Sequence, residues 1–271
     1  MSQQKGQAKV SLVIADVDGT LLTRRKVLTP RAQAAVKALD AAGIAFAITS
    51  GRPPRGMAML IEPLALKTPI GGFNGGIFVR PDMSIIEEHV LAAESARLAV
   101  EVILKNSLDA WVYTGTEWLI RNQNAPHVEH EQFVVKFAPK VVAGFVEFGH
   151  VVKITGISDD RDAVARCEAN LIQELGARAS VARSQPYYID VTNPEANKGV
   201  VVAVLSRVLS ILPDRILTIG DMPSDTLMFR KSGISVAMGN ADSDVKSTAQ
   251  LITDSCDDEG FAKAMEQFVL S

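Results

Sequence analysis

The sequence has little of what marks secreted, membrane-spanning or nucleic-acid-binding proteins. It holds two cysteines, Cys167 and Cys256, with no CxxC spacing, so neither a disulfide framework nor a cysteine metal site is expected. No apolar run approaches the ~18 residues of a membrane span. Residues 1–9 are polar and lack the apolar region of a signal peptide. These absences predict a cytoplasmic protein that does not enter a membrane.

An excess of positive charge is also missing. The net charge is −3, and Arg24-Arg25-Lys26 is the one basic run, which we interpret as a solvated loop. This balance argues against nucleic acid as a partner. The 271 residues are 47% hydrophobic and 22% charged, an ordinary globular composition. Their number allows one large domain or two modest ones, in a monomer or a homodimer.

What the chain does contain is an alternation of buried strands and amphipathic helices. Residues 10–15 read as a buried strand, and residues 44–48 as a second. Between them, Thr29-Pro30 begins a helix that Gly43 ends. A strand, helix and strand in this order predict a parallel sheet. The same alternation of strands and helices returns near the end of the chain, with strands predicted at 215–219 and 234–238.

The middle of the chain differs, because both tryptophans and all three tyrosines fall there. Its strands alternate polar with apolar residues at hairpin spacing, and two amphipathic helices accompany them at 94–105 and 162–175. This pattern predicts an antiparallel sheet with helices on one face. We therefore expect a first part of the core at 1–81, an inserted α+β domain at 82–187, and the second part of the core at 188–271.

Polar clusters follow three of the predicted core strands, at 16–20, 49–52 and 220–225. The first, Asp-Val-Asp-Gly-Thr, brings Asp16 and Asp18 together at the end of a strand, where open α/β sheets bind ligands. Two buried carboxylates repel each other, so such a site favours a hard divalent cation. By itself the motif also suits an acidic turn that caps a helix.

Together these motifs resemble the haloacid dehalogenase (HAD)-like hydrolase superfamily, in its Cof-type branch with a class IIB cap. The similarity lies in DVDGT at 16–20, TSGR at 49–52, NKG around Lys198, GDMPSD at 220–225, FNGG at 73–76 and the tail 234–260. The resemblance implies an α/β fold: a HAD-like Rossmannoid parallel-sheet core with helices on both faces and an inserted α+β (C2-type) cap domain.

The resemblance also implies roles for the acidic residues. Asp16 is the expected nucleophile, which splits hydrolysis of a phosphate monoester into formation and breakdown of an aspartyl-phosphate. Asp18 is the expected general acid and base. Asp16, Asp221 and the backbone carbonyl of Asp18 are the expected ligands of Mg²⁺, which offsets the repulsion between nucleophile and phosphate.

Further residues are expected around the phosphate. Ser50, Gly51 and Lys198 would bind its oxygens through a hydroxyl, backbone N–H groups and a point charge. Asp225 would bond metal-bound water or orient Lys198. The branch usually has Asn where Ser224 stands, and a hydroxyl replaces only one of an amide's hydrogen bonds. Ser224 is therefore expected to change how water or substrate is organised.

Other candidates keep two interpretations. Arg52 is a substrate contact or a surface ion pair, and Asn74 is a substrate contact or a turn residue. Asn197 is a substrate contact or, more simply, a helix cap. His127 and His130 have a spacing that would suit zinc, although a solvated loop is the simpler interpretation.

The predicted function is a Mg²⁺-dependent phosphohydrolase of small phosphorylated metabolites, sugar phosphates among them. Two alternatives stay open. One is a phosphomutase or phosphotransferase that passes the phosphoryl group to a sugar through the same intermediate. The other is a regulator that binds a phosphorylated ligand without turning it over, although pure binding does not need Asp18.

Overall fold

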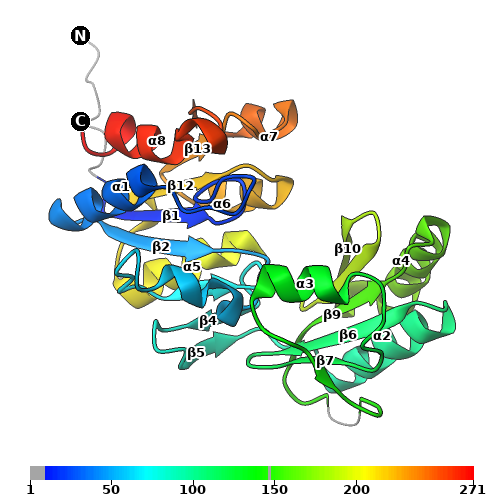
Figure 1. The fold of residues 1–271 in the computed structure, drawn as a ribbon. Coiled ribbons are helices and arrows are strands. Elements are labelled where there is room, and N and C mark those ends of the chain that lie inside the picture. Colours follow the sequence, from blue (N-terminus) through cyan, green and yellow to red (C-terminus); the bar gives the residue numbers. More distant parts are fainter. Residues whose placement is uncertain (1–9, 146–147) are drawn as a thin grey trace.

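The computed structural model describes residues 10–145 and 148–271, so the polar segment 1–9 lies outside it. The chain forms two lobes, each built on one β-sheet (Figure 1). Among the described residues, no helix combines the length and the apolar character needed to cross a membrane.

The first lobe is an eight-stranded sheet in the order β14-β13-β12-β1-β2-β3-β4-β5. Its strands are β1 (Leu12–Asp16), β2 (Ala45–Thr49), β3 (Ile70–Gly72), β4 (Ile77–Val79), β5 (Ile85–Glu88), β12 (Ile216–Gly220), β13 (Ile234–Ala237) and β14 (Leu251–Ile252). The strands from β14 to β3 pair in parallel, as predicted, whereas β4 and β5 add antiparallel pairs at one edge. The sheet is therefore mixed.

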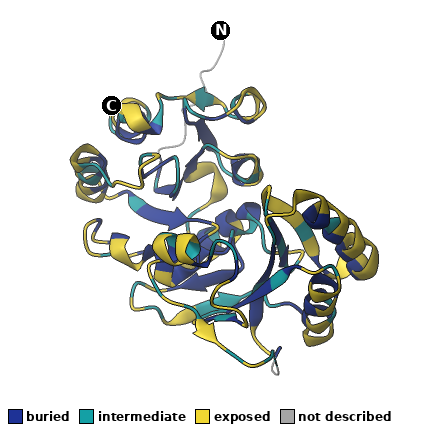
Figure 2. Ribbon diagram, turned by 45° about the vertical axis from the view of Figure 1, so that its right-hand side comes forward, coloured by how far each residue is buried: buried dark blue, intermediate teal, exposed yellow. Residues whose placement is uncertain are grey.

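Helices cover both faces of this sheet, as predicted. On β1, Val13 and Ala15 pack with α1 (Pro30–Ala41) and α8 (Gly260–Phe268). Leu12 and Ile14 point to the other side, because successive side chains of a strand alternate. There they join α5 (Lys198–Leu209), α6 (Thr226–Phe229) and α7 (Ser243–Thr248). In Figure 2 the central strands are dark blue, which marks buried residues, and the outer helix faces are yellow, which marks exposed ones.

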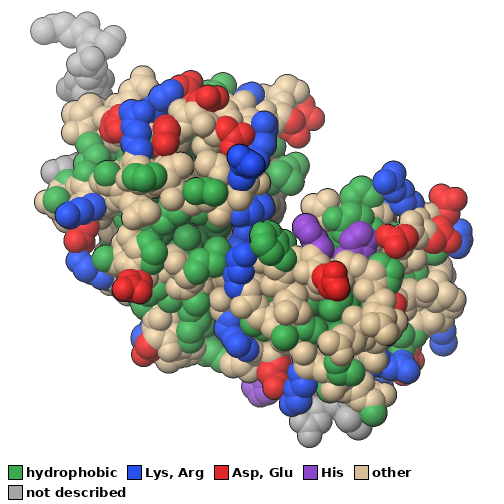
Figure 3. Space-filling view, viewed as in Figure 1, with side chains coloured by type: hydrophobic (Ala, Val, Ile, Leu, Met, Phe, Trp, Pro, Cys, Tyr) green, Lys and Arg blue, Asp and Glu red, His purple; other side chains and the backbone are tan. Residues whose placement is uncertain are grey.

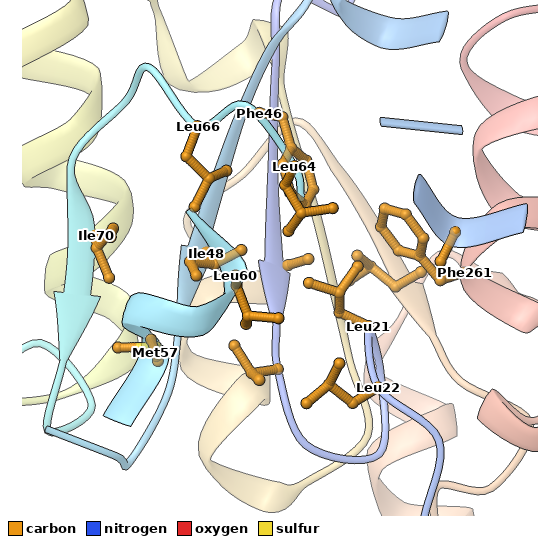
Figure 4. Packing of buried hydrophobic residues seen from close by; sticks show 14 of the residues in the cluster. Leu21, Leu22, Phe46, Ile48, Met57, Leu60, Leu64, Leu66, Ile70 and Phe261 are labelled. Carbon is orange, nitrogen blue, oxygen red and sulfur yellow. The ribbon is translucent and has the colours of Figure 1, made fainter. Parts of the chain in front are cut away.

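The apolar residues after the first acidic motif fix its turn to the core. Leu21 and Leu22 lie in one buried cluster with Ile48 of β2 and with Met57 and Leu60 of the 3₁₀ segment η1 (Pro54–Leu60), as Figure 4 shows. The motif is thus anchored on both sides, by β1 before it and by these leucines after it.

The second lobe is a six-stranded sheet in the order β10-β11-β9-β6-β7-β8. Its elements are α2 (Ala93–Lys105), β6 (Asp109–Thr114), β7 (Trp118–Ile120), α3 (Val128–Val135), β8 (Lys140–Val141), β9 (Val151–Ile157), α4 (Arg161–Leu175), β10 (Ser180–Gln185) and β11 (Tyr188–Thr192). α2 and α4 pack on one face, as predicted. The other face joins the core of the first lobe through Trp111, Trp118 and Tyr188.

Helix α3 was not predicted from the sequence. It is short, and the residues at its two ends, His127 and Lys136, both have left-handed backbone angles. It contacts η1 of the first lobe, so it lies where the two lobes meet.

The pairing of strands bears on where the inserted domain begins and ends. β5 belongs to the first sheet and β11 to the second, so the chain crosses between lobes at 89–92 and at 193–197. The two crossovers lie side by side, because Asn193 Nδ2 donates to the carbonyl of Val90 at 2.7 Å. We propose these crossovers as the domain limits, a few residues beyond the expected 82 and 187.

Candidate active site

Three central strands bring the predicted motifs to one edge of the first sheet. β12, β1 and β2 are parallel neighbours, so their carboxyl ends meet. Asp16 ends β1, Ser50 follows β2 and Asp221 follows β12. In Figure 1 the arrows of β1 and β2 point to the side on which the second lobe lies. The site thus faces the junction of the lobes.

Lys198 joins two buried carboxylates from different motifs. As the first residue of α5, it donates from Nζ to Asp16 Oδ1 and to Asp225 Oδ1, each at 2.5 Å. All three side chains are almost fully buried. Burial raises the pKa of Asp16 to about 8, although the positive charge of Lys198 acts in the opposite direction. Burial would lower the pKa of Lys198, but the charges of Asp16 and Asp225 outweigh it and raise this pKa. Lys198 therefore bridges Asp16 and Asp225, and its contact with Asp16 was not predicted from the sequence.

Asp225 is held in place by the turn that carries it. Its Oδ2 accepts from the backbone N–H groups of Asp221 and Met222 at 2.9 and 2.8 Å. A Cβ at position 220 would lie 2.3 Å from Asp225 Cγ, so only glycine fits there. With one oxygen on the backbone and the other on Lys198, Asp225 orients the lysine.

The three carboxylates of Asp16, Asp221 and Asp225 offer oxygen atoms within 4.8 Å of one another. Within the described part of the chain, this is the one group of three or more side chains that suits a metal. An all-oxygen donor set fits Mg²⁺, and burial already raises the pKa of Asp221 to about 6, so a cation would stabilise the ionised forms. The set contains the expected side-chain ligands Asp16 and Asp221 and adds Asp225, whereas the backbone carbonyl of Asp18 stays a predicted ligand.

The turn after β1 is shaped around Asp221. Gly19 has a left-handed φ of 83°, and a Cβ there would lie 2.5 Å from Asp221 Oδ2. Thr20 Oγ1 donates to Asp221 Oδ1 at 3.1 Å. Asn240 Nδ2 donates both to Asp221 Oδ2 at 3.0 Å and to the carbonyl of Gly19 at 2.9 Å.

Asn240 and Thr20 were not among the predicted site residues. The signal for Asn240 was its position just after the strand predicted at 234–238, the same place in the sheet as the other polar clusters. Thr20 was part of the first motif, where it had been assigned no role.

Asp18 is not a member of this triad, and its carboxylate pairs with two cations. Arg52 binds it with two hydrogen bonds, Nε to Oδ2 at 2.7 Å and Nη2 to Oδ1 at 2.6 Å, and Lys26 Nζ lies 2.7 Å from Oδ1. Burial alone would raise the pKa of Asp18, but these hydrogen bonds hold it below its ordinary value. Lys26 lies in an exposed loop, as predicted, and from there its ammonium group also reaches Asp18.

Arg52 also links the site to the second lobe. Its Nη1 donates to the carbonyl of Val134 in α3 at 3.2 Å and to that of Gly56 at 3.3 Å. The residue is 5% exposed. Arg52 therefore forms an ion pair, as one of its two interpretations predicted, but the arginine is buried rather than on the surface. The same side chain connects Asp18 to the inserted domain.

The remaining predicted residues lie around this centre. Ser50 is buried, and its Oγ accepts from the N–H of Arg52 at 3.2 Å. The side chain of Asn74 lies against Gly51, since a Cβ there would sit 3.4 Å from Asn74 Nδ2. Asn197 caps α5 by accepting from the N–H groups of Gly199 and Val200, so the simpler interpretation of this residue is confirmed.

Ser224 lies half-buried in the turn η4 (Pro223–Asp225), next to the aspartate that holds Lys198. The structure gives its side chain no contact that explains the departure from the branch.

The histidine pair does not form a zinc site in the described structure. His127 Nε2 lies 2.9 Å from Asp159 Oδ1, and its ring stacks on Tyr187 at 3.9 Å. The acid triad above is the metal-ligand group found among the described residues, and it contains neither His127 nor His130.

The chain matches known proteins over nearly its whole length. The family model of haloacid dehalogenase-like hydrolases covers residues 13–265. The 5-amino-6-(5-phospho-D-ribitylamino)uracil phosphatase YcsE of Bacillus subtilis is 24% identical over 274 residues, which span all of both chains.

Solved structures agree in fold. A haloacid dehalogenase-like hydrolase from Bacteroides thetaiotaomicron superposes with a TM-score of 0.89 at 29% identity, over 96% of this chain and 99% of that one. The HAD subclass IIB sugar phosphatase BT4131 superposes with a TM-score of 0.80 at 20% identity, over 97% and 100%. The chain therefore belongs to the haloacid dehalogenase-like hydrolases, in their Cof-type branch of phosphatases with a class IIB cap.

Proposed function

We propose that the protein is a Mg²⁺-dependent phosphohydrolase that cleaves phosphate monoesters of small metabolites, sugar phosphates among them, through an aspartyl-phosphate. One observation carries the proposal: the buried carboxylate of Asp16 lies against Lys198 and beside Asp221, while Asp18 stands apart with its own cations. Two carboxylates in such different surroundings suit two different roles.

Asp16 supplies the nucleophile. One of its oxygens attacks phosphorus, the bond from phosphorus to the ester oxygen breaks, and the leaving alkoxide takes a proton from Asp18. In the second step Asp18 takes a proton from water, whose oxygen attacks phosphorus and releases Asp16 and inorganic phosphate. Asp16, Asp221 and Asp225 would hold Mg²⁺, which would offset the charge repulsion between carboxylate and phosphate.

Asp18 needs a proton before the first step, yet Arg52 and Lys26 bind both of its oxygens. These contacts favour the carboxylate form, which is the form needed for the second step. We infer that an incoming phosphate dianion draws the two cations toward its own oxygens, which raises the proton affinity of Asp18 when the acid is required.

Phosphate release from p-nitrophenyl phosphate tests the proposal. Turnover is expected with Mg²⁺ and not with EDTA, and Asp16→Asn is expected to be inactive. Turnover without metal, or full activity of the variant, would contradict it. ³¹P NMR of a sugar phosphate then separates hydrolysis from transfer, because a mutase moves the phosphate without releasing inorganic phosphate.

A further inference from the structure

The face of the cap sheet that looks toward the active site carries charged residues on its central strands. On the face covered by α2 and α4, Val112, Ile154 and Ile189 form an apolar core. Their strand neighbours point the other way, and among these are Lys153 of β9 and Asp190 of β11. A partly buried ion pair adds little to the stability of a packed interface, so packing against the first lobe does not explain these charges.

These charges form one cluster with residues from β6 and α3. Asp190 Oδ1 accepts from Thr155 Oγ1 at 2.8 Å and lies 3.0 Å from Lys153 Nζ. Tyr113 OH donates to Glu131 Oε1 at 2.8 Å. The side chains of Lys153 and Asp190 are 16% and 18% exposed, so they stay within reach of a ligand. We call Tyr113, Glu131, Lys153, Tyr188 and Asp190 the cap cluster.

One member of the cap cluster has a buried hydroxyl with no protein partner. Tyr188 is 8% exposed, and its OH makes no hydrogen bond within the described structure. A buried hydroxyl without a partner is unfavourable and rare. Burial, and after it the charge of Glu131, raises the pKa of Tyr188. The oxygen atom is also closed off from solvent, so a bound molecule with hydroxyl groups would give it its missing partner only after the side chains around it shift.

The cap cluster adjoins the phosphate-binding loop. The ring of Tyr113 lies 5.4 Å from the ring of Phe73, whose N–H donates to the carbonyl of Arg52. One turn of α3 separates Glu131 from Val134, whose carbonyl accepts from Arg52. The space-filling view shows a notch between the lobes on this side (Figure 3). A phosphate held near Ser50 and Lys198 would therefore direct its leaving group toward the cluster.

We propose that the cap cluster binds the leaving group of the substrate and selects neutral, hydroxyl-rich leaving groups over those that carry a second anion. The inference rests on the proposed function. Glu131 and Asp190 bring two negative charges against the one positive charge of Lys153, so a second carboxylate or phosphate is repelled. Hydroxyl groups, by contrast, donate to the carboxylates and accept from Lys153 and from Tyr188 OH.

A matched pair of substrates tests this selection. Sorbitol 6-phosphate and 6-phosphogluconate differ in one terminal group, a hydroxymethyl in the first and a carboxylate in the second. The wild type is expected to prefer sorbitol 6-phosphate in kcat/KM by roughly tenfold or more, since like charges at a binding site are costly. Asp190→Asn releases the charge of Lys153, so this ratio is expected to fall at least ~fivefold.

Two further variants separate binding from folding. Glu168→Gln also removes one negative charge from the cap, but on α4, where Glu168 pairs with Arg183, so it is expected to keep the wild-type ratio and turnover. Tyr188→Phe loses no hydrogen bond of the free protein, so its melting temperature is expected to stay unchanged or rise. Its KM for sorbitol 6-phosphate is nevertheless expected to rise several-fold.

The outcomes are distinguishable from failure of the proposed function. Absence of phosphate release from p-nitrophenyl phosphate and from both matched substrates overturns the proposed function and this inference with it. Turnover of p-nitrophenyl phosphate overturns the inference alone if neither matched substrate is cleaved, if the wild-type ratio is near one, or if Asp190→Asn and Glu168→Gln shift it equally.

Discussion

Two clusters of charged side chains meet at the junction of the lobes, and they are built differently. In the core, Lys198 is bonded to both Asp16 and Asp225, and all three are almost fully buried. In the cap, Lys153 and Asp190 keep part of their surface, and the bonds to Asp190 among the described residues end on one oxygen, Oδ1. The oxygens of Asp225 and the ammonium group of Lys198 already have partners within the protein, whereas the cap cluster has polar atoms that make no hydrogen bond among the described residues.

Under the two proposals above, the difference divides chemistry in the core from recognition in the cap. Catalytic groups must be held in one geometry before the substrate arrives, and burial with paired charges achieves that. Groups that recognise a leaving group must instead exchange water for the ligand's hydroxyls, which requires some exposure. The four predictions below probe this contrast, beginning with the largest expected effect.

Asp16→Asn is expected to reduce phosphate release at least ~10³-fold, the scale of losing a nucleophile in covalent catalysis. The amide cannot attack phosphorus, and the other groups of the site cannot replace it. Initial rates of phosphate release with Mg²⁺ measure the loss. Asp40→Asn, which removes a carboxylate from the exposed pair with Lys67, is the control and should keep the wild-type rate. A variant that retains more than a tenth of the activity would contradict the assignment.

Lys198→Met is expected to destabilise the metal-free protein by about 3–5 kcal/mol, because it leaves buried carboxylates without their cation. Lys67→Met breaks the exposed pair with Asp40 and should cost ~0–1 kcal/mol. Urea unfolding in EDTA gives both values. Equal losses in the two variants would mean that the core cluster is less buried than the structure shows.

Mg²⁺ is expected to stabilise the protein more at about pH 8 than at about pH 5. Burial raises the pKa of Asp16 to about 8 and that of Asp221 to about 6. The folded protein then holds these protons more tightly than the unfolded chain, so metal-free stability falls as pH rises through this range. Mg²⁺ binds the ionised carboxylates and offsets the fall.

Melting temperatures with Mg²⁺ and with EDTA at the two pH values measure how much the metal stabilises the protein. A metal at ~100 times its Kd stabilises the folded state by about 2.7 kcal/mol. Asp221→Asn is expected to lose most of the stabilisation. Mg²⁺ stabilisation that is equal at both pH values would show that the acid triad does not take up the metal.

Glu131→Gln should have the smallest effect, a change in stability of roughly 1 kcal/mol or less. Burial raises the pKa of Glu131, so its contribution to stability is full at low pH and is lost as pH rises past its ordinary value. Gln keeps an acceptor for Tyr113 OH and carries no charge. The variant is therefore expected to match the wild type in acid and to be slightly more stable near neutral pH.

Melting curves at about pH 4 and about pH 7 compare the two proteins, with Glu117→Gln, in an exposed pair with Lys140, as the control. A variant that is less stable than the wild type at both pH values would mean that the glutamate charge stabilises the cap.

The members of the core cluster were named through the family resemblance, and short-range rules explain why they lie at one edge of the sheet. A buried strand that ends in polar residues presents them at the edge of the sheet, and a helix that begins at Lys198 presents that lysine there too. The alternation of strands and helices was enough to predict a parallel sheet, and the family resemblance added the helices on both faces. The antiparallel edge of the sheet was not predicted, and β5 was assigned to the inserted domain, because its short run does not show which neighbour it pairs with.

Contacts that depend on tertiary structure could not be predicted from the sequence. Lys26 reaches Asp18 only because the chain turns back between Thr23 and Val27. Asn240 binds Asp221 across two neighbouring strands. The cap cluster depends on the register of β6, β9 and β11, which places Tyr113 opposite Lys153 and Asp190 opposite Thr155. Changing that register by one residue would turn these side chains to the other face.

The hydrogen bond from Asn193 to the carbonyl of Val90 has a consequence for how this protein can be re-engineered and how it can diversify. It shows that the chain leaves the core and returns to it at neighbouring points. An insert with adjacent ends can be exchanged as a cassette, since the strands on either side keep their spacing. A different cap joined at these two crossovers would leave Asp16, Lys198 and Asp221 in place in the first lobe, but it would have to replace the carbonyl of Val134 that holds Arg52.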